Sequence, residues 1–429
     1  MITVTLAVAL AFQNPADTAQ GAGRPCEVAI DSMARAYTRP QGTATNYFGG
    51  GGIRAHCKGT STTLAADTMA YYSALGRLDL LGQVQIRDTT LALDANFVSY
   101  FIRDERLEAR RNVVTVNRRT GSVLRGPNLH YFRAVKGIRD TVEMYATSRP
   151  TVEYREAPDS GEPYVIVADR LRFKGDDRVW AGGRVTVDRS DFASRSDSLL
   201  LDQAQGFGVL VGQPRVEGKD GQSYTLAGTR IELGLERREV RLVKALGRGK
   251  ATGADWHLTA DTIHLMVEAR KLQGALAWGD SLRPHAVSTL YTVEADSLAI
   301  DTPGEVLTES RAFGRALSTA QRDSASPAAE IDWIAGDSLT ARLVQEPDST
   351  GRARSRLQQI HARGSARALT HHFDARDSTA APGINYSRGQ RIAVALKGDR
   401  IDRVVVAGRA DGLQLEPLPP APPDTTAKP

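Results

Sequence analysis

Serine in a Gly-Asp-Ser-Leu tetrapeptide is the first residue of this sequence with a type and setting that suit chemistry. The tetrapeptide occurs at 279–282 and at 336–339. A serine nucleophile for acyl hydrolysis needs one strained turn with a base and an oxyanion hole around it. Near copies at 196–199 and 295–298 indicate instead that the phrase belongs to a repeat. We therefore expect no hydrolase and no other enzyme.

Histidine and aspartate are the candidate metal ligands. His257 and His264 lie seven residues apart on an expected strand, which would turn them to opposite faces. His371 and His372 have no Cys or Glu at ligand spacing. One Asp recurs per repeat without the glycine-rich context of a calcium-binding β-helix, and we expect it to accept a hydrogen bond at a strand end. The sequence predicts neither a metal nor a cofactor.

Two cysteines, Cys26 and Cys57, follow a short apolar run from Ile2 to Phe12 and a polar stretch. Such a run is typical of a secretory signal segment, and we expect one at 1–22. An even number of cysteines in an exported chain favours a disulfide, here Cys26 with Cys57. A metal or redox pair is the alternative, which the absence of a Cys-x-x-Cys motif disfavours.

The 429 residues are 41% hydrophobic and 24% charged, which excludes a chain that is disordered throughout and allows a large buried core. Most of the 55 basic residues are arginines. Arginine suits phosphate or carboxylate partners because guanidinium pairs with them through two parallel hydrogen bonds. Codon usage in a GC-rich genome is the alternative explanation.

A six-residue phrase recurs along the chain and indicates how these residues are positioned. Its clearest copies are Ala-Asp-Thr-Met-Ala-Tyr at 66–71, Ala-Asp-Arg-Leu-Arg-Phe at 168–173, Ala-Asp-Thr-Ile-His-Leu at 260–265 and Ala-Asp-Ser-Leu-Ala-Ile at 295–300. Weaker copies begin at 95, 126, 196, 228, 336 and 389. Recurrence on this scale is the signature of a repeat architecture.

The fourth and sixth residues of every hexad are apolar or aromatic, whereas the third and fifth are mostly polar or small. This period of two indicates β-strands with one face toward a core. In the first eight copies the fourth and sixth residues are the candidate lining of an apolar groove: Met69, Tyr71, Val98, Tyr100, Leu129, Tyr131, Leu171, Phe173, Leu199, Leu201, Ile231, Leu233, Ile263, Leu265, Leu298 and Ile300.

A second phrase, with a glycine among small or β-branched residues, follows most hexads. Examples are Ala-Gly-Gly-Arg-Val-Thr-Val at 181–187 and Val-Val-Ala-Gly-Arg-Ala at 405–410. Each unit is therefore expected to be two strands and a turn, with glycine at a bulge or bend. A unit of this size cannot bury its apolar face alone, so the units should stack into one all-β core.

The alternation of the two phrases resembles the OstA-like repeat of the LptA family of lipopolysaccharide-transport proteins, which includes LptA, LptC and the N-terminal domain of LptD, here without its barrel. The segments 53–60 and 402–410 fit the same pattern, and the resemblance covers about residues 47–416. It implies an all-β fold, an elongated twisted β-jellyroll of about ten two-strand repeats whose antiparallel sheets form a V. Segments 1–22 (signal-peptide-like), 23–46 (N-terminal extension) and 417–429 (a Pro-rich disordered tail) would flank it.

The resemblance also implies a non-enzymatic protein of the periplasm that holds the acyl chains of lipid A between its sheets and helps to carry them to the outer membrane. The partners it implies are lipopolysaccharide, other jellyroll transport proteins through edge-strand pairing, and an outer-membrane barrel, with no nucleic acid. Arg170, Arg172, Arg178 and Arg184 would meet lipid phosphates at the rim or form an ordinary solvated face.

Two other classes of protein stay open at this point. A structural or adhesive β-repeat protein would have a closed core and no lipid ligand. A carbohydrate-active β-helix would show shorter coils with clustered acidic residues, a pattern that this sequence lacks.

Overall fold

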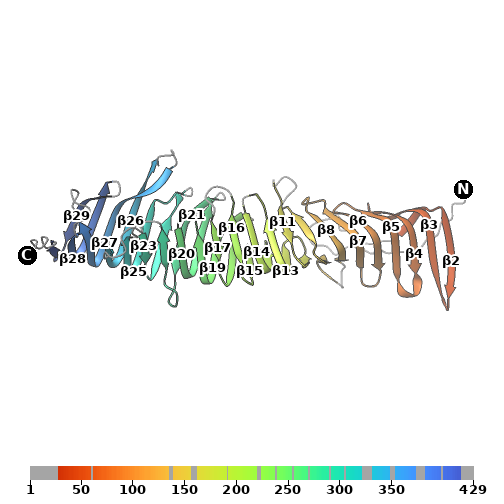
Figure 1. Cartoon of the computed structure of the whole chain (residues 1–429). Coiled ribbons are helices and arrows are strands. Elements are labelled where there is room, and N and C mark those ends of the chain that lie inside the picture. Colours follow the sequence, from red (N-terminus) through yellow and green to blue (C-terminus); the bar gives the residue numbers. More distant parts are fainter. Residues whose placement is uncertain are drawn as a thin grey trace, which may run out of the picture. The chain divides into compact units, whose positions relative to one another are not determined.

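The computed structural model describes residues 28–58, 61–134, 139–155, 162–190, 192–219, 224–236, 239–253, 256–268, 271–288, 291–303, 306–320, 331–347, 353–372, 382–397 and 400–416. The chain divides into two compact units: unit 1 comprises Met1–Asp220 and Arg230–Glu239, and unit 2 comprises Gly221–Thr229 and Val240–Pro429. Most of the described residues lie in antiparallel β-strands that stack side by side within each unit (Figure 1), which confirms the predicted all-β jellyroll class.

Unit 1 contains the earlier strands and one short 3-10 turn. These elements are β1 (Val28–Ser32), β2 (Arg35–Gln41), β3 (Ala44–Cys57), β4 (Thr63–Tyr72), η1 (Ser73–Leu75), β5 (Arg77–Arg87), β6 (Leu91–Phe101), β7 (Arg106–Asn117), β8 (Val123–Phe132), β9 (Glu143–Thr147), β10 (Thr151–Tyr154), β11 (Tyr164–Val167), β12 (Arg170–Lys174), β13 (Arg178–Asp188), β14 (Phe192–Asp202), β15 (Phe207–Val211), β16 (Arg215–Gly218) and β18 (Arg230–Glu236).

Unit 2 contains the later strands, apart from the first residue of β19. They are β17 (Thr225–Ala227), β19 (Glu239–Thr252), β20 (Trp256–Glu268), β21 (Lys271–Trp278), β22 (His285–Ser288), β23 (Tyr291–Glu294), β24 (Ser297–Asp301), β25 (Glu309–Ala320), β26 (Trp333–Pro347), β27 (Ala353–His372), β28 (Gly383–Lys397), β29 (Arg400–Ala407) and β30 (Asp411–Leu415).

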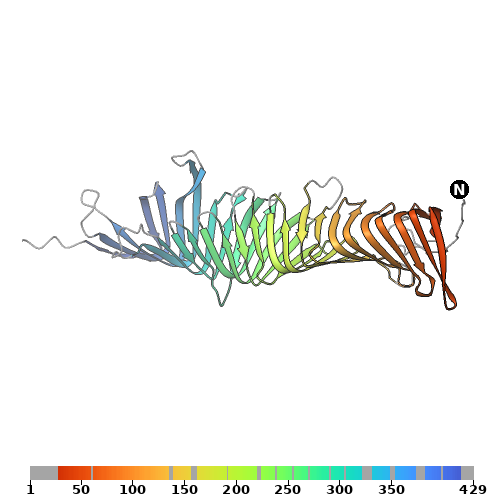
Figure 2. The same cartoon turned by 45° about the vertical axis from the view of Figure 1, so that its right-hand side comes forward.

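Many of the long strands bend in the middle, so that each has two arms, and the bend is visible in Figure 2. The register between β13 and β14 shifts between Gly182 and Val185. Within this shift Gly183 and Arg184 both have positive φ, 80° and 46°. Two residues on one strand thus oppose one on its neighbour, which is the pattern of a β-bulge and turns the strand.

Glycine is required at this bend because the Asp of the hexad occupies the space beside it. A Cβ atom at Gly183 would overlap the Asp169 carboxylate, and one at Gly314 would overlap the Asp296 carboxylate. Both glycines also have positive φ, a conformation that other residues adopt only at a cost. The expected glycine bulge is therefore present, and the neighbouring strand's hexad Asp fixes its place.

The bend changes the alternation of faces within the hexad. Ala168 and Leu171 are both buried, although they are three residues apart and an unbroken strand would place them on opposite faces. Because of this shift, the buried faces of both arms look into one interior. The first residue of every hexad is also small, which lets the arms approach closely beside the bend.

Strands outside the hexads end the stacks. The extension at 23–46 supplies β1 and β2, which pair with the two arms of β3. In the described residues β29 and β30 pair in the same manner with the two arms of β28. The first and last strands of the described chain are thus each divided into two short strands.

Candidate functional site

The fourth residues of the hexads form the deepest row of the interior in each unit. In unit 2 the registers place an alanine between successive members of this row, in the order Ala245, Ile263, Ala277, Leu298, Ala312, Leu339, Ala362 and Ile392. None of these eight side chains is more than 4% exposed. Large and small side chains alternate, so they can interlock where the arms converge.

Unit 1 carries the same row with less regular spacing of small residues. The registers join Met69, Leu80, Val98, Ala109, Leu129, Ala146, Leu171, Ala181, Leu199, Leu210 and Ile231 in one line across its strands. Leu199 is the most exposed member at 6%. This line is a continuous apolar floor for the unit.

The sixth residues of the hexads form a second row, farther from the bend. Of the eight predicted groove residues in this row, Tyr71, Leu201 and Ile300 are half-exposed and the other five are buried. The eight predicted groove residues at the fourth position are all buried. Exposure therefore increases with distance from the bend. The second row is the part of the interior that a ligand can reach first.

The second row of unit 1 contains a glycine, Gly208, which has no side chain to contribute. This glycine lies between Leu201 and Leu233 in the register of β14, β15 and β18. An added Cβ would lie 3.3 Å from one methyl carbon of Leu233 and 3.5 Å from one of Leu201. The side chains of Leu201 and Leu233 therefore already close over this buried glycine, and a larger residue would have to push them apart.

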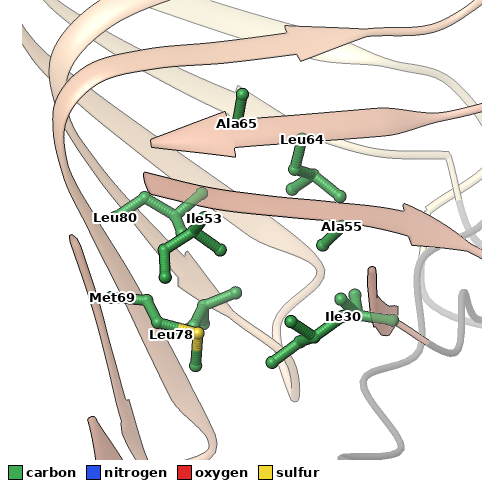
Figure 3. A pocket seen from close by; sticks show the side chains of 9 residues that line it. Ile30, Ile53, Ala55, Leu64, Ala65, Met69, Leu78 and Leu80 are labelled. Carbon is green, nitrogen blue, oxygen red and sulfur yellow. The ribbon is translucent and has the colours of Figure 1, made fainter. Parts of the chain in front are cut away.

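A small cavity lies among the first strands of unit 1 (Figure 3). Its volume is about 10 Å³, about the space of one water molecule. A chain of methylene groups would fit only if the surrounding side chains moved apart. Apolar side chains from β1, β3, β4 and β5 line it: Val28, Ile30, Ile53, Ala55, Leu64, Ala65, Met69, Leu78 and Leu80.

One polar cluster interrupts the second row of unit 1. The Tyr100 hydroxyl donates a hydrogen bond of 2.5 Å to the Glu105 carboxylate, and the Arg133 guanidinium lies 3.6 Å from it. Burial raises the pKa of the Glu105 carboxyl, although the hydrogen bond from Tyr100 and the charge of Arg133 act in the opposite direction. The repeat pattern did not reveal this cluster, because both charged residues lie outside the hexads: Glu105 is in the turn before β7, and Arg133 follows the end of β8. A buried tyrosine that needs a hydrogen-bond partner was the available signal.

The arginines considered for a lipid rim lie on the outer face, opposite to the buried Leu171 and Phe173. Arg172 donates to Glu143 at 3.1 Å and lies over the ring of Trp180. Arg178 and Arg184 are paired with Asp202 and Asp169, at 2.6 Å and 2.7 Å, while Arg170 is exposed. The contacts of these side chains fit the ordinary solvated face.

The histidines of β20 correct one expectation. His257 and His264 both face outward, because their neighbours Leu258 and Ile263 are buried and the intervening bend shifts the alternation. His264 packs edge to face on Trp278, with ring centroids 4.5 Å apart. Within the described residues, no group of three or more His, Cys, Asp or Glu side chains is arranged to hold a metal ion.

The serine of the tetrapeptide at 336–339 is an ordinary strand residue. Ser338 pairs with Phe313 on one side and Arg363 on the other. In the tetrapeptide at 279–282, the backbone N–H groups of Ser281 and Leu282 donate to the Asp261 carboxylate. The hexad Asp thus accepts hydrogen bonds at a bend, close to its predicted role.

Several predictions fall outside the described residues: the segment 1–22, Cys26 and the tail 417–429. Cys57 is fully buried at the end of β3, and its pairing with Cys26 stays a prediction. In the part of the chain that the structure covers, no helix has the length and apolarity needed to cross a membrane.

Fold and site together define a β-jellyroll class of protein, with bent strands around an apolar interior of two rows. Among solved structures, the chain is similar to the crystal structure of LptH, the LptA homologous periplasmic component of the lipopolysaccharide transport device from Pseudomonas aeruginosa. The sequences are 20% identical, the match covers 34% of this chain and 97% of LptH, and the TM-score is 0.24. A TM-score this low supports no conclusion about function. No family model and no curated protein matches the chain.

Proposed function

We propose that the chain is a non-enzymatic lipid-binding protein of the periplasm that holds the acyl chains of lipopolysaccharide between its arms and takes part in their transport to the outer membrane. The observation that supports this proposal is the second row of inward-facing hexad residues, which is apolar or aromatic apart from the polar cluster at Tyr100 and is half-exposed at Tyr71, Leu201 and Ile300. The choice of lipopolysaccharide rests on the resemblance of the repeats to the LptA family.

Acyl chains would enter from the second row and separate the arms. Each methylene group transferred from water to an apolar site contributes about 0.8 kcal/mol. That gain offsets the loss of contacts between facing side chains, such as those beside Gly208. Because the rows offer few hydrogen-bond donors or acceptors, the site would select by apolar length and not by headgroup.

The terminal strands suggest how such a protein would join its partners. In the described residues β2 pairs along one side with β3, and β29 and β30 pair along one side with β28. Strands with an unpaired side can accept a further strand by main-chain hydrogen bonding. We propose that other jellyroll transport proteins, and an outer-membrane barrel, bind in this way.

Photocrosslinking in cells tests the lipid site with a matched pair of leucines. Leu201 and Leu200 are neighbours on β14, are both half-exposed and face opposite sides. A photoreactive residue at Leu201 should give a lipopolysaccharide adduct, and the same residue at Leu200 should give none. No adduct at Leu201, Tyr71 or Ile300 in folded protein would contradict the proposal.

A structural or adhesive β-repeat protein is the second candidate. The burial of the fourth hexad residues, at most 6% exposed, favours it, because a closed core needs no ligand. Mass spectrometry of lipid extracted from purified protein distinguishes the two candidates. Bound acyl chains favour transport, and their absence together with an unchanged fold favours the structural role.

A further inference from the structure

The last strands of one arm of unit 2 carry their apolar side chains on the outer face. Ala368 is only 5% exposed and pairs with Ser387, so Ser387 faces the interior and its neighbours Tyr386 and Arg388 face outward. The same alternation places polar or small residues inside, at Asn385, Ser387, Gly412 and Gln414. It places apolar residues outside, at Ile384, Tyr386, Leu413 and Leu415.

These residues continue an apolar surface across four strands. The registers join Trp333, Leu369, Tyr386 and Leu413 in one row, and Ile384 and Leu415 lie beside it. We call these six side chains the outer patch. Leu413 and Leu415 are 56% and 50% exposed, and the rings of Trp333 and Tyr386 are in edge contact with centroids 6.3 Å apart. On β25 the corresponding residue, which pairs with Trp333, is the polar Thr319.

Arginines border the outer patch on the side of the bend. Arg367 lies directly opposite Arg388, and Arg363 lies directly opposite Arg391, all facing outward. Like charges at directly opposed positions of a sheet repel one another. Asp411 pairs with Arg388 at 2.6 Å, and Arg363, Arg367 and Arg391 make no ion pair with a described residue.

The acidic residues that the structure describes near this surface include Asp332, Asp337 and Glu416, which directly follows Leu415 and is exposed. Asp332 is bound to His371 at 2.6 Å, and Asp337 packs against Gly364 at the bend. Arg363, Arg367 and Arg391 therefore have no acidic partner among the described residues that would offset the repulsion across the sheet. An anionic partner would relieve the repulsion between the opposed arginines, since guanidinium groups pair well with phosphate.

The size of the outer patch decides between a protein and a membrane as the partner. Four strands spaced about 4.8 Å apart and two rows of side chains cover roughly 14 Å by 7 Å. A stable protein interface buries about 800 Å² on each partner, well beyond this area. A bilayer surface needs no such area, because a few apolar and aromatic side chains together with basic residues suffice for reversible binding.

We propose that the outer patch binds the surface of an anionic lipid bilayer. Trp333 and Tyr386 lie at the level of the headgroups, where such rings are preferred, Leu413 and Leu415 enter the acyl boundary, and the arginines contact lipid phosphates. This would explain why β28 and β30 carry their apolar side chains on the outer face, since that face would be covered by the bilayer. This inference is independent of a lipid in the interior.

Flotation of the full-length protein with vesicles tests the proposal. Vesicles of 70% phosphatidylcholine and 30% phosphatidylglycerol should bind the protein, and pure phosphatidylcholine should bind it much less. Leu413→Thr/Leu415→Thr should lower binding at least tenfold, and Arg367→Gln/Arg391→Gln should lower it about twentyfold, with the difference shrinking in high salt. Leu276→Thr and Arg248→Gln, at exposed positions of the same unit away from the outer patch, are the matched controls.

A second readout keeps the test independent of small losses in stability. Acyl chains brominated near the headgroup should quench the fluorescence of wild-type protein and quench Trp333→Phe less, while the three other tryptophans serve as internal reference. Equal binding to both vesicle types, equal binding of the variants and their controls, or no vesicle binding would overturn the proposal. Dimerisation that only the Leu413/Leu415 variant abolishes would assign the face to a second copy and would overturn it as well.

Discussion

The carboxylate of Asp169 accepts a hydrogen bond of 2.7 Å from Arg184, the second of the two left-handed residues at the bend of the neighbouring strand. Asp296 and Arg315 repeat this relationship in unit 2, also at 2.7 Å. The hexad Asp therefore contacts both residues of the bulge: it packs on the glycine and binds the arginine. One side chain thus links the two phrases of the repeat at the place where the strands bend.

The pairing of Asp169 predicts a loss of stability in acid. The hydrogen bond from Arg184, assisted by Arg149, holds the pKa of the Asp169 carboxyl below its ordinary value of 3.8. A lowered pKa in the folded state adds stability above the unfolded pKa, and this is lost as the pH falls from 3.8 through the lowered value. Thermal unfolding of wild type and Asp169→Asn should differ at neutral pH and converge in this acid range. If Arg184→Gln leaves that difference unchanged, the pairing is not its cause.

Substitution of the bend glycine should be costly. Gly183→Ala places a Cβ against the Asp169 carboxylate at a φ of 80°, and we expect a loss of about 2 to 3 kcal/mol. Gly175→Ala is the matched control, because Gly175 also has positive φ, 59°, but its nearest neighbour would be a methyl group of Thr141 at 3.4 Å. Its cost should be about 1 kcal/mol. Equal losses in chemical denaturation would show that the contact with Asp169 does not matter.

The buried pair of Tyr100 and Glu105 should couple strongly. Tyr100→Phe leaves the Glu105 carboxylate without its hydroxyl donor, and we expect a loss of about 1 to 3 kcal/mol. Tyr100→Phe should cost less in the background of Glu105→Gln, since no buried charge is then deprived of its partner. A double-mutant cycle measures the coupling, and additive losses would contradict it.

Glu105 should also impose a pH dependence opposite to that of Asp169. Burial raises the pKa of this carboxyl above 4.5, so the folded state binds a proton that the unfolded state has released. Stability should therefore fall as the pH rises from 4.5 through the raised value. Glu105→Gln should flatten this part of the profile, which thermal unfolding at a series of pH values can measure. A profile that Glu105→Gln leaves unchanged would show that the carboxyl titrates normally.

A polar residue in the second row should weaken lipid binding without unfolding the chain. Leu201→Asn removes one half-exposed apolar side chain that faces the interior, and we expect about a tenfold lower affinity for lipopolysaccharide. Leu200→Asn, on the outer face of the same strand, should bind as wild type does. Titration with a fluorescent lipopolysaccharide measures both variants. If Leu201→Asn and Leu200→Asn bind lipopolysaccharide with equal affinity, the lipid does not bind at the second row.

The sequence allowed the inward rows to be predicted because period two is a local property. Leu171 and Phe173, for example, are buried as their spacing required. The bend was harder to place, because Asp169 meets Gly183 only through a cross-strand register that no single phrase contains. An Ala two residues before the glycine, as at Ala181 and Ala312, was a usable signal, since these alanines fill the deepest row.

The outward apolar residues of β28 and β30 could not be predicted from the repeat. Ile392 and Val394 in the same strand face inward as expected and are buried, but beyond the bend the pattern reverses. In both arms successive side chains still alternate between the two faces of the sheet. In one arm the apolar set faces the interior, and in the other it faces outward. That phase depends on the pairing of Ser387 with Ala368, which becomes known only when the register of the sheet is known.

The bend built from an Asp and a glycine on adjacent strands has a consequence for how such a chain changes its length over evolution. Each bend is specified by two short phrases in neighbouring strands and draws on no distant part of the sequence. If one hexad is duplicated or deleted together with its glycine phrase, the other bends of this kind therefore keep the Asp and the glycine that form them. Such a protein can gain or lose whole repeats without a change in the strand pairing of the repeats that remain.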